Sequence, residues 1–193
     1  LGSQYSYSLT LGDIDGDFDL DLITGSWNST NRIYVNDGTG FFTSSGTVGG
    51  STGTFAVKLG DVDADGDLDL VEGNWNGQSN RVYLNDGGGS FSDSGQAIGS
   101  GNSADLILGD VDGDGSPDIA VCDYGGPNKI YLNDGTGVFV DSLQNLGSDD
   151  SVAGVLGDID NDGYLDFIVG NVLQPNLIYQ NDGSGTFSTN GQQ

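Results

Sequence analysis

Asp-Val-Asp-Ala-Asp-Gly-Asp-Leu-Asp, residues 61–69, is the stretch that decides the fold, and it recurs at 13–21, 110–118 and 158–166. Places one, three, five and nine are Asp in all four copies. Carboxylates at alternate places of a tightly curved loop can surround Ca²⁺, which takes about six to eight oxygen ligands. Because these carboxylates would repel one another without a cation, the four copies predict four calcium loops.

Two other places of the loop indicate how it turns and binds. Place seven varies from Asp to Ser to Tyr, so we expect it to bind calcium through its backbone carbonyl. Place six should be Gly, because a sharp turn there needs a positive φ angle. Phe18 is the exception among the four copies. We therefore expect the first loop to bind most weakly or to adopt a different turn.

The second copy also fits the EF-hand pattern, because Glu72 stands at the twelfth place counted from Asp61. The other copies carry Thr24, Val121 and Val169 at this place. An EF-hand also needs a helix on each side, whereas the flanking segments are short and rich in β-branched or apolar residues. The EF-hand interpretation is therefore rejected.

The acidic charge limits the partners of the chain. Its 193 residues carry a formal net charge of −25, concentrated in the four loops. Even with four Ca²⁺ bound the chain would repel nucleic acid and anionic membrane surfaces, so neither is an expected partner. No run of 18 apolar residues is present, which predicts no membrane insertion. Cys122, the single cysteine, replaces a Gly of the other copies and is expected to be a small buried residue.

The whole sequence is repetitive, with loops starting 48 or 49 residues apart. In the second repeat, 55–59, 68–71 and 81–84 have the composition of short strands. The Asn-Asp-Gly after the third strand predicts a hairpin, and a fourth strand begins at 90. Four short antiparallel strands per repeat are typical of a propeller blade.

We therefore predict an all-β fold, a single β-propeller domain over residues 1–193 built from four four-stranded blades of about 48 residues. Three arrangements fit: a closed four-bladed ring, half of an eight-bladed dimer, or a piece of a longer array. The closed ring is favoured, because the end of the repeat pattern continues into its beginning. An open arc would also leave a sheet edge and an apolar face exposed.

Three sequence motifs resemble FG-GAP/VCBS-type repeats, the calcium-binding blades of integrin α-subunit propellers and of many secreted proteins. They are Leu-Gly-Asp-φ-Asp-x-Asp-Gly-x-Leu-Asp (φ, apolar), Asn-Arg/Lys-φ-Tyr-Leu-Asn-Asp-Gly and Gly-x-Gly-x-Phe, and together they cover essentially the whole chain. The resemblance implies Ca²⁺ ligands at places one, three, five and nine of each loop, with a backbone oxygen at place seven. The four loops predict about four Ca²⁺, and loops this numerous suit the high calcium of an extracellular location. Phe18 and the low blade number depart from the family pattern. The calcium residues expected from the motif and the resemblance are Asp13, Asp15, Asp17, Asp19, Asp21, Asp61, Asp63, Asp65, Asp67, Asp69, Asp110, Asp112, Asp114, Ser116, Asp118, Asp158, Asp160, Asp162, Tyr164 and Asp166.

A binding or adhesion module for glycans or matrix proteins is the function predicted from the residues away from the loops. In a blade, the connection between the second and third strands lies on the rim opposite the calcium loop. Aromatic and amide residues that suit sugar faces and hydroxyls stand there, namely Trp27, Asn28, Trp75, Asn76 and Tyr124. The alternative is that these rings pack between blades as core.

Catalysis is not expected, because the chain has no His, only one Glu, and Asp pairs already assigned to calcium. A structural repeat unit of a surface fibre or larger secreted protein, or the non-catalytic propeller of a polysaccharide-degrading enzyme, is the alternative function.

Overall fold

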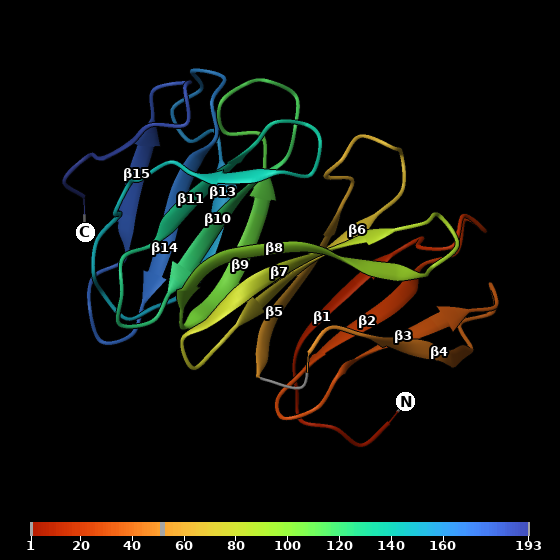
Figure 1. The fold of residues 1–193 in the computed structure, drawn as a ribbon. Coiled ribbons are helices and arrows are strands. Elements are labelled where there is room, and N and C mark those ends of the chain that lie inside the picture. The colour runs from red at the N-terminus through yellow and green to blue at the C-terminus, as the bar shows by residue number, and fades with distance from the viewer. Residues whose placement is uncertain (1, 51–52, 193) are drawn as a thin grey trace.

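The computed structural model describes residues 2–50 and 53–192, which form sixteen strands and no helix. Each repeat makes one four-stranded antiparallel sheet whose strands pair in chain order, and these sheets are the four blades (Figure 1). Blades 1 and 2 contain β1 (Ser6–Gly12), β2 (Asp21–Ser26), β3 (Asn31–Asn36), β4 (Phe42–Val48), β5 (Thr54–Gly60), β6 (Asp69–Asn74), β7 (Gln78–Asn85) and β8 (Phe91–Gly101). Blades 3 and 4 contain β9 (Ser103–Gly109), β10 (Asp118–Asp123), β11 (Lys129–Asn133), β12 (Phe139–Asp141), β13 (Ser151–Gly157), β14 (Asp166–Asn171), β15 (Leu177–Asn181) and β16 (Phe187–Thr189).

The predicted propeller architecture is confirmed, and the predicted strands of the second repeat are β5 to β8. Each Asp-rich loop connects the first and second strands of its blade, and each Asn-Asp-Gly hairpin connects the third and fourth. Both connections lie on one rim of the arc because consecutive antiparallel strands reverse direction. The connections between second and third strands therefore lie on the opposite rim.

The hydrophobic core consists of three buried clusters, one between each pair of neighbouring blades. β10 shows how a central strand serves two of them. Ile119 and Val121 pack toward blade 2, whereas Ala120 and Cys122 pack toward blade 4. Side chains of a strand alternate between its faces, so a central blade needs apolar residues at successive positions. Cys122 is fully buried, as expected, and burial raises the pKa of its thiol.

The favoured closed ring is wrong for the single chain, because the blades form an open arc with blades 1 and 4 at its two ends (Figure 1). Leu11 and Leu20 on the free face of blade 1 are 56% and 57% exposed, although the leucines at these places in blades 2 and 4 pack against a glycine of the neighbouring blade. Similar packing at each junction gives a similar rotation from blade to blade, and four blades do not complete a turn. Among the described residues, no helix is long and apolar enough to span a membrane.

Candidate metal centres and the opposite rim

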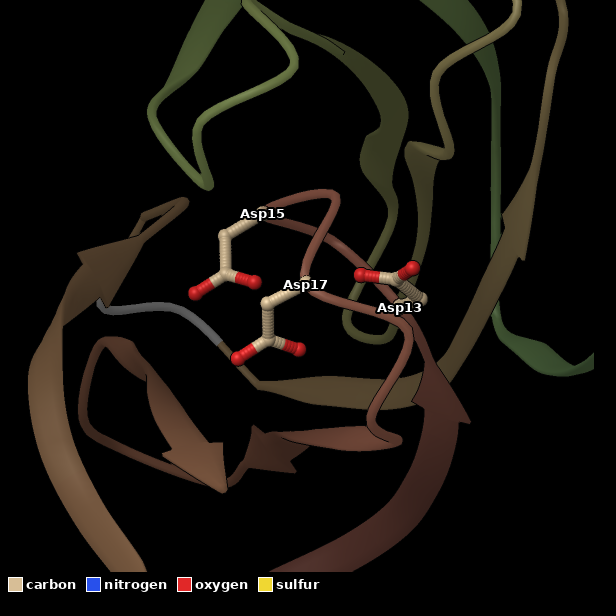
Figure 2. A group of neighbouring side chains, drawn as sticks. All are labelled: Asp13, Asp15 and Asp17. Carbon is tan, nitrogen blue, oxygen red and sulfur yellow. The ribbon is translucent and has the colours of Figure 1, made fainter. Parts of the chain in front are cut away.

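The first Asp-rich loop brings Asp13, Asp15 and Asp17 together between β1 and β2 (Figure 2). A carboxylate oxygen from each lies within 4.8 Å of the others. In the other three loops the group instead contains the residues at places one, three and nine. These groups are Asp61, Asp63 and Asp69; Asp110, Asp112 and Asp118; and Asp158, Asp160 and Asp166.

The predicted residues at places five and seven stand apart from these three later groups. Each place-five carboxylate accepts a hydrogen bond from the backbone N–H of place seven, as Asp65 does from Asp67 at 2.9 Å. Asp114 and Asp162 do the same with Ser116 and Tyr164. The side chain at place seven lies against the Gly of the Asn-Asp-Gly hairpin in the same blade. This holds for Asp19, Asp67, Ser116 and Tyr164. This orientation is consistent with the predicted use of the place-seven carbonyl.

All four loops make the same turn at place six, including the one with Phe18. The N–H of Phe18 donates to Asp13 at 2.9 Å, as Gly66 donates to Asp61 at 3.1 Å. Phe18 has a φ of 70°, and the three glycines at this place have φ of 94° to 97°. The expectation of a different turn is therefore wrong, although the left-handed backbone costs Phe18 about 1–2 kcal/mol relative to an ordinary conformation.

The Asp at place nine is a structural anchor as well as a member of three of the groups. Asp69 is fully buried, and both of its carboxylate oxygens accept backbone hydrogen bonds. One comes from Val62 in its own loop at 3.0 Å, and the other from Asn85 in the hairpin at 2.9 Å. Asp21, Asp118 and Asp166 make the same pair of bonds. This residue thus ties each Asp-rich loop to its hairpin.

The electrostatics of the loops fit a hard cation. Burial, followed by repulsion from neighbouring carboxylates, raises the pKa of Asp15 and of Asp63. Burial also raises the pKa of Asp118 to about 6. Asp15 Oδ1 and Asp61 Oδ1 are buried and accept no hydrogen bond from the described residues. An all-oxygen group of anions with unpaired acceptors is the donor set that Ca²⁺ prefers.

The opposite rim carries a row of five aromatic side chains, here called the aromatic strip: Tyr7, Trp27, Phe55, Trp75 and Tyr124. Phe55 stacks on Tyr7 with ring centroids 4.4 Å apart and on Trp75 at 4.5 Å. Trp27 meets Phe55 edge-on at 5.2 Å, and Tyr124 lies 5.5 Å from Trp75. The strip therefore runs continuously across blades 1 to 3.

The sequence left two environments open for these rings, an exposed binding rim or the core between blades, and their burial is intermediate between the two. Trp27, Trp75 and Tyr124 are half-buried, but none belongs to the three buried clusters. Asn28 and Asn76 are exposed directly beside the two Trp rings, both with positive φ. In blade 4 the equivalent residue is the exposed Val172, so the strip ends before it.

Sequence reasoning missed Tyr7 and Phe55 as members of the strip. They occupy the same place near the start of the first strand in blades 1 and 2, where blades 3 and 4 have Ala104 and Val152. This aromatic pair was the available signal. What the sequence does not show is that the first strand of one blade reaches the rim beside the Trp of its neighbour.

Glu72 lies in the second half of β6, away from the Asp-rich loop, and is not part of the carboxylate group of that loop, in agreement with the rejection of the EF-hand. It is buried and accepts a hydrogen bond from the Thr54 hydroxyl at 2.6 Å. Burial raises the pKa of its carboxyl group. The side chain borders a hollow of about 460 Å³ between blades 1 and 2, which Arg81, Tyr83 and Asp93 also line.

The sequence matches the family model of the FG-GAP-like repeat three times, at residues 13–72, 61–121 and 110–169. Each match begins at the first Asp of an Asp-rich loop. No curated protein is similar enough in sequence to be matched with this chain.

Similar solved structures are propeller-like and share little sequence with this chain. A lectin from Agrocybe aegerita, described as specific for non-reducing terminal N-acetylglucosamine, has a TM-score of 0.61 and 23% identity, with 92% of this chain covered and 49% of the lectin. The computationally designed protein Ika4 has a TM-score of 0.57 and 16% identity, with 92% of each chain covered. The designed protein Ika8 has a TM-score of 0.58 and 14% identity, with 95% of this chain covered and 48% of Ika8. The chain thus spans about half the length of the lectin and of Ika8, and these likenesses show the fold alone.

Proposed function

Because the chain belongs to the FG-GAP-like repeat family, we propose that it is a calcium-stabilised extracellular β-propeller that binds glycans or matrix proteins through the aromatic strip. The observation that carries this proposal is the position of the strip on the rim opposite the four Asp-rich loops. One rim holds the fold together with calcium, and the other meets the partner.

The strip has the chemistry that sugar recognition uses. Half-exposed rings such as Trp75 present apolar surface to the C–H groups of a sugar, and the neighbouring Asn76 offers both a donor and an acceptor to its hydroxyls. Because the rings form one continuous row, an extended glycan or polymeric matrix can contact several of them together. The likeness in fold to a lectin supports this class of partner.

Calcium is proposed to stabilise the blades rather than to take part in a reaction. Each of the four groups of carboxylates would hold one Ca²⁺, and the ion would neutralise carboxylates that otherwise repel one another. Each ion bound only by the folded state contributes about 2.7 kcal/mol at a hundredfold excess over Kd. Sites of this kind suit the high calcium of the extracellular space, which motivates the proposed location.

No enzymatic activity is proposed. The only Glu is buried against Thr54, and the chain has no His to transfer protons near neutral pH. The second candidate function is a structural repeat unit of a surface fibre or larger secreted protein, or the non-catalytic propeller of a polysaccharide-degrading enzyme. The structural repeat unit is favoured by the high internal symmetry and predicts no ligand beyond calcium.

The test is an array of glycans and matrix proteins, probed with the wild-type chain, Trp75→Ala and Leu143→Ala. Leu143 is a matched control, because it is 79% exposed and lies outside the strip. We expect Trp75→Ala to lose most binding while its melting temperature stays within a few degrees of the control. Chelation should weaken binding, because it lowers the stability of the folded chain. A Trp75→Ala chain that binds as wild type but melts far earlier would show that the ring belongs to the core.

A further inference from the structure

At all three internal junctions between blades, at least one leucine of one blade covers a glycine of the blade before it, with Leu108 alone covering Gly60 at the middle junction and two leucines at each of the other two. A Cβ added at Gly12 would meet Leu59 and Leu68 of blade 2 within 2.9 Å. Likewise, one at Gly109 would meet Leu156 and Leu165 of blade 4 within 3.1 Å. Because glycine has no side chain, each of these positions leaves a small hollow that leucines of the next blade fill, here called the leucine socket.

At the two ends of the arc this packing is incomplete, because a glycine at one end and leucines at the other have no partner among the described residues. At Gly157, the equivalent position of blade 4, an added Cβ would meet none of the described residues within 4 Å. In blade 1 the equivalent leucines are Leu11 and Leu20, which are 56% and 57% exposed. Blade 4 thus offers an empty socket, and blade 1 offers the leucines that would fill it.

A hydrogen bond follows the same pattern. The side-chain amide of Asn133 donates to the Val62 carbonyl of blade 2 at 2.8 Å, and Asn85 and Asn181 make the corresponding bonds at their junctions. Within the described part of the chain, the amide of Asn36 in blade 1 donates only to Leu20 of its own blade. The carbonyl that would complete its pattern belongs to Ile159, whose side chain is 41% exposed. The corresponding Ile14, Val62 and Val111 are at most 2% exposed.

We propose that the free faces of blades 1 and 4 pair with those of a second copy of this chain, so that two arcs close into an eight-bladed ring. The free face of blade 1 is complementary to the free face of blade 4, and neither face is complementary to a second copy of itself. Blade 1 of each copy therefore docks on blade 4 of the other, and two identical junctions close around a two-fold axis. Each new junction repeats the leucine socket and the Asn36 bond. The arc also matches about half the length of the lectin and of Ika8, which share its fold.

A disulfide across the new junction tests the pairing directly. The Cβ atoms facing each other at Gly12 and Leu59, and at Gly109 and Leu156, are 3.9 Å apart, within the range for a disulfide. The variant Leu11→Cys/Gly157→Cys places two thiols at the matching positions of the proposed junction, and native Cys122 is buried. Oxidised glutathione, reduced to two thiols per bond formed, supplies the oxidant. Calcium is kept present throughout.

We expect a species with the mass of two chains on a denaturing, non-reducing gel, with both engineered thiols consumed and the single-chain mass restored by reductant. A single-chain mass with the two engineered cysteines joined in one disulfide, and no glutathione attached, would show closure within one chain and overturn the proposal. So would a ladder of higher masses, which would indicate an open filament, or free thiols that react at the rate of exposed cysteines.

The non-covalent association is tested by sedimentation in calcium with matched single variants. Leu11→Asp buries an unpaired charge in the proposed junction and should raise the dimer dissociation constant by about 100-fold or more. Leu143→Asp, at an exposed site outside both free faces, should leave it unchanged. Circular dichroism confirms that each variant folds. A wild-type chain that remains monomeric at tens of micromolar would refute the proposal.

Discussion

Replacing Asp69 with Asn separates the structural role of the place-nine carboxylate from its role toward calcium. Asp69 is fully buried and accepts N–H groups from Val62 and Asn85. The introduced amide would keep one acceptor and turn an NH₂ group toward the other N–H. The change loses a charge-assisted hydrogen bond of about 1.5–3 kcal/mol and leaves a buried donor unpaired at about 1–3 kcal/mol. We expect a loss of about 3 kcal/mol in the free energy of unfolding.

The matched variant is Asp63→Asn in the same loop. Burial, followed by repulsion from neighbouring carboxylates, raises the pKa of both Asp63 and Asp69. Among the described residues, Asp63 accepts only one backbone hydrogen bond, from Asp65 at 3.3 Å, so little offsets the destabilising effect of its charge without a cation. In chelator Asp63→Asn should therefore equal or exceed wild type in stability, whereas Asp69→Asn should melt about 6–12 °C earlier. In calcium Asp63→Asn should lose the contribution of one ion, about 2.7 kcal/mol at a hundredfold excess over Kd.

Thermal melts of the three proteins, each in chelator and in calcium, decide between these roles. If Asp69→Asn melts with wild type in chelator, the two backbone hydrogen bonds do not anchor the loop and the reasoning is refuted. If Asp63→Asn keeps the full response to calcium, Asp63 is not a ligand. Circular dichroism of the folded baselines shows whether either variant changes the secondary structure.

Three further outcomes are expected. Chelation should lower the melting temperature of the wild-type chain markedly, and an unchanged melt after confirmed metal removal would contradict structural calcium. Phe18→Gly should raise the calcium affinity of the first loop several-fold in titration calorimetry, because Phe18 adopts a left-handed φ of 70° that glycine adopts without strain. The Phe18 ring is 93% exposed, so the substitution loses little packing. Equal calcium affinities of wild type and variant would show that this turn does not limit binding. Burial raises the pKa of Glu72 above its unfolded value, so its stabilising contribution is present at low pH and is lost as pH rises through the folded pKa. The free energy of unfolding of Glu72→Gln, relative to wild type, should therefore rise from pH 4 to pH 8 in denaturant titrations. The rise should be about 1.4 kcal/mol for each unit by which the pKa is raised. A difference in free energy between the two proteins that stays constant with pH would count against this.

The sequence alone determined the blades, the Asp-rich loops and their places. These features depend on residues close together in the chain. Alternating apolar residues define short strands, Asn-Asp-Gly defines a hairpin, and Asp at alternate places defines a loop that groups carboxylates. Even the positive φ at place six follows from the glycines of three copies, and the first copy adopts the same turn with Phe18.

The features that only the tertiary structure decided all join residues from different strands or different blades. Asp69 meets Asn85 because the two connections share a rim, and Phe55 stacks on Tyr7 because the first strands of neighbouring blades lie side by side. The open arc depends on the rotation accumulated over three junctions. That rotation is set by how side chains such as Leu59 pack on Gly12, 47 residues away in the chain. A repeat pattern specifies that blades follow one another, but the shape of the packed surfaces determines how many blades complete a turn.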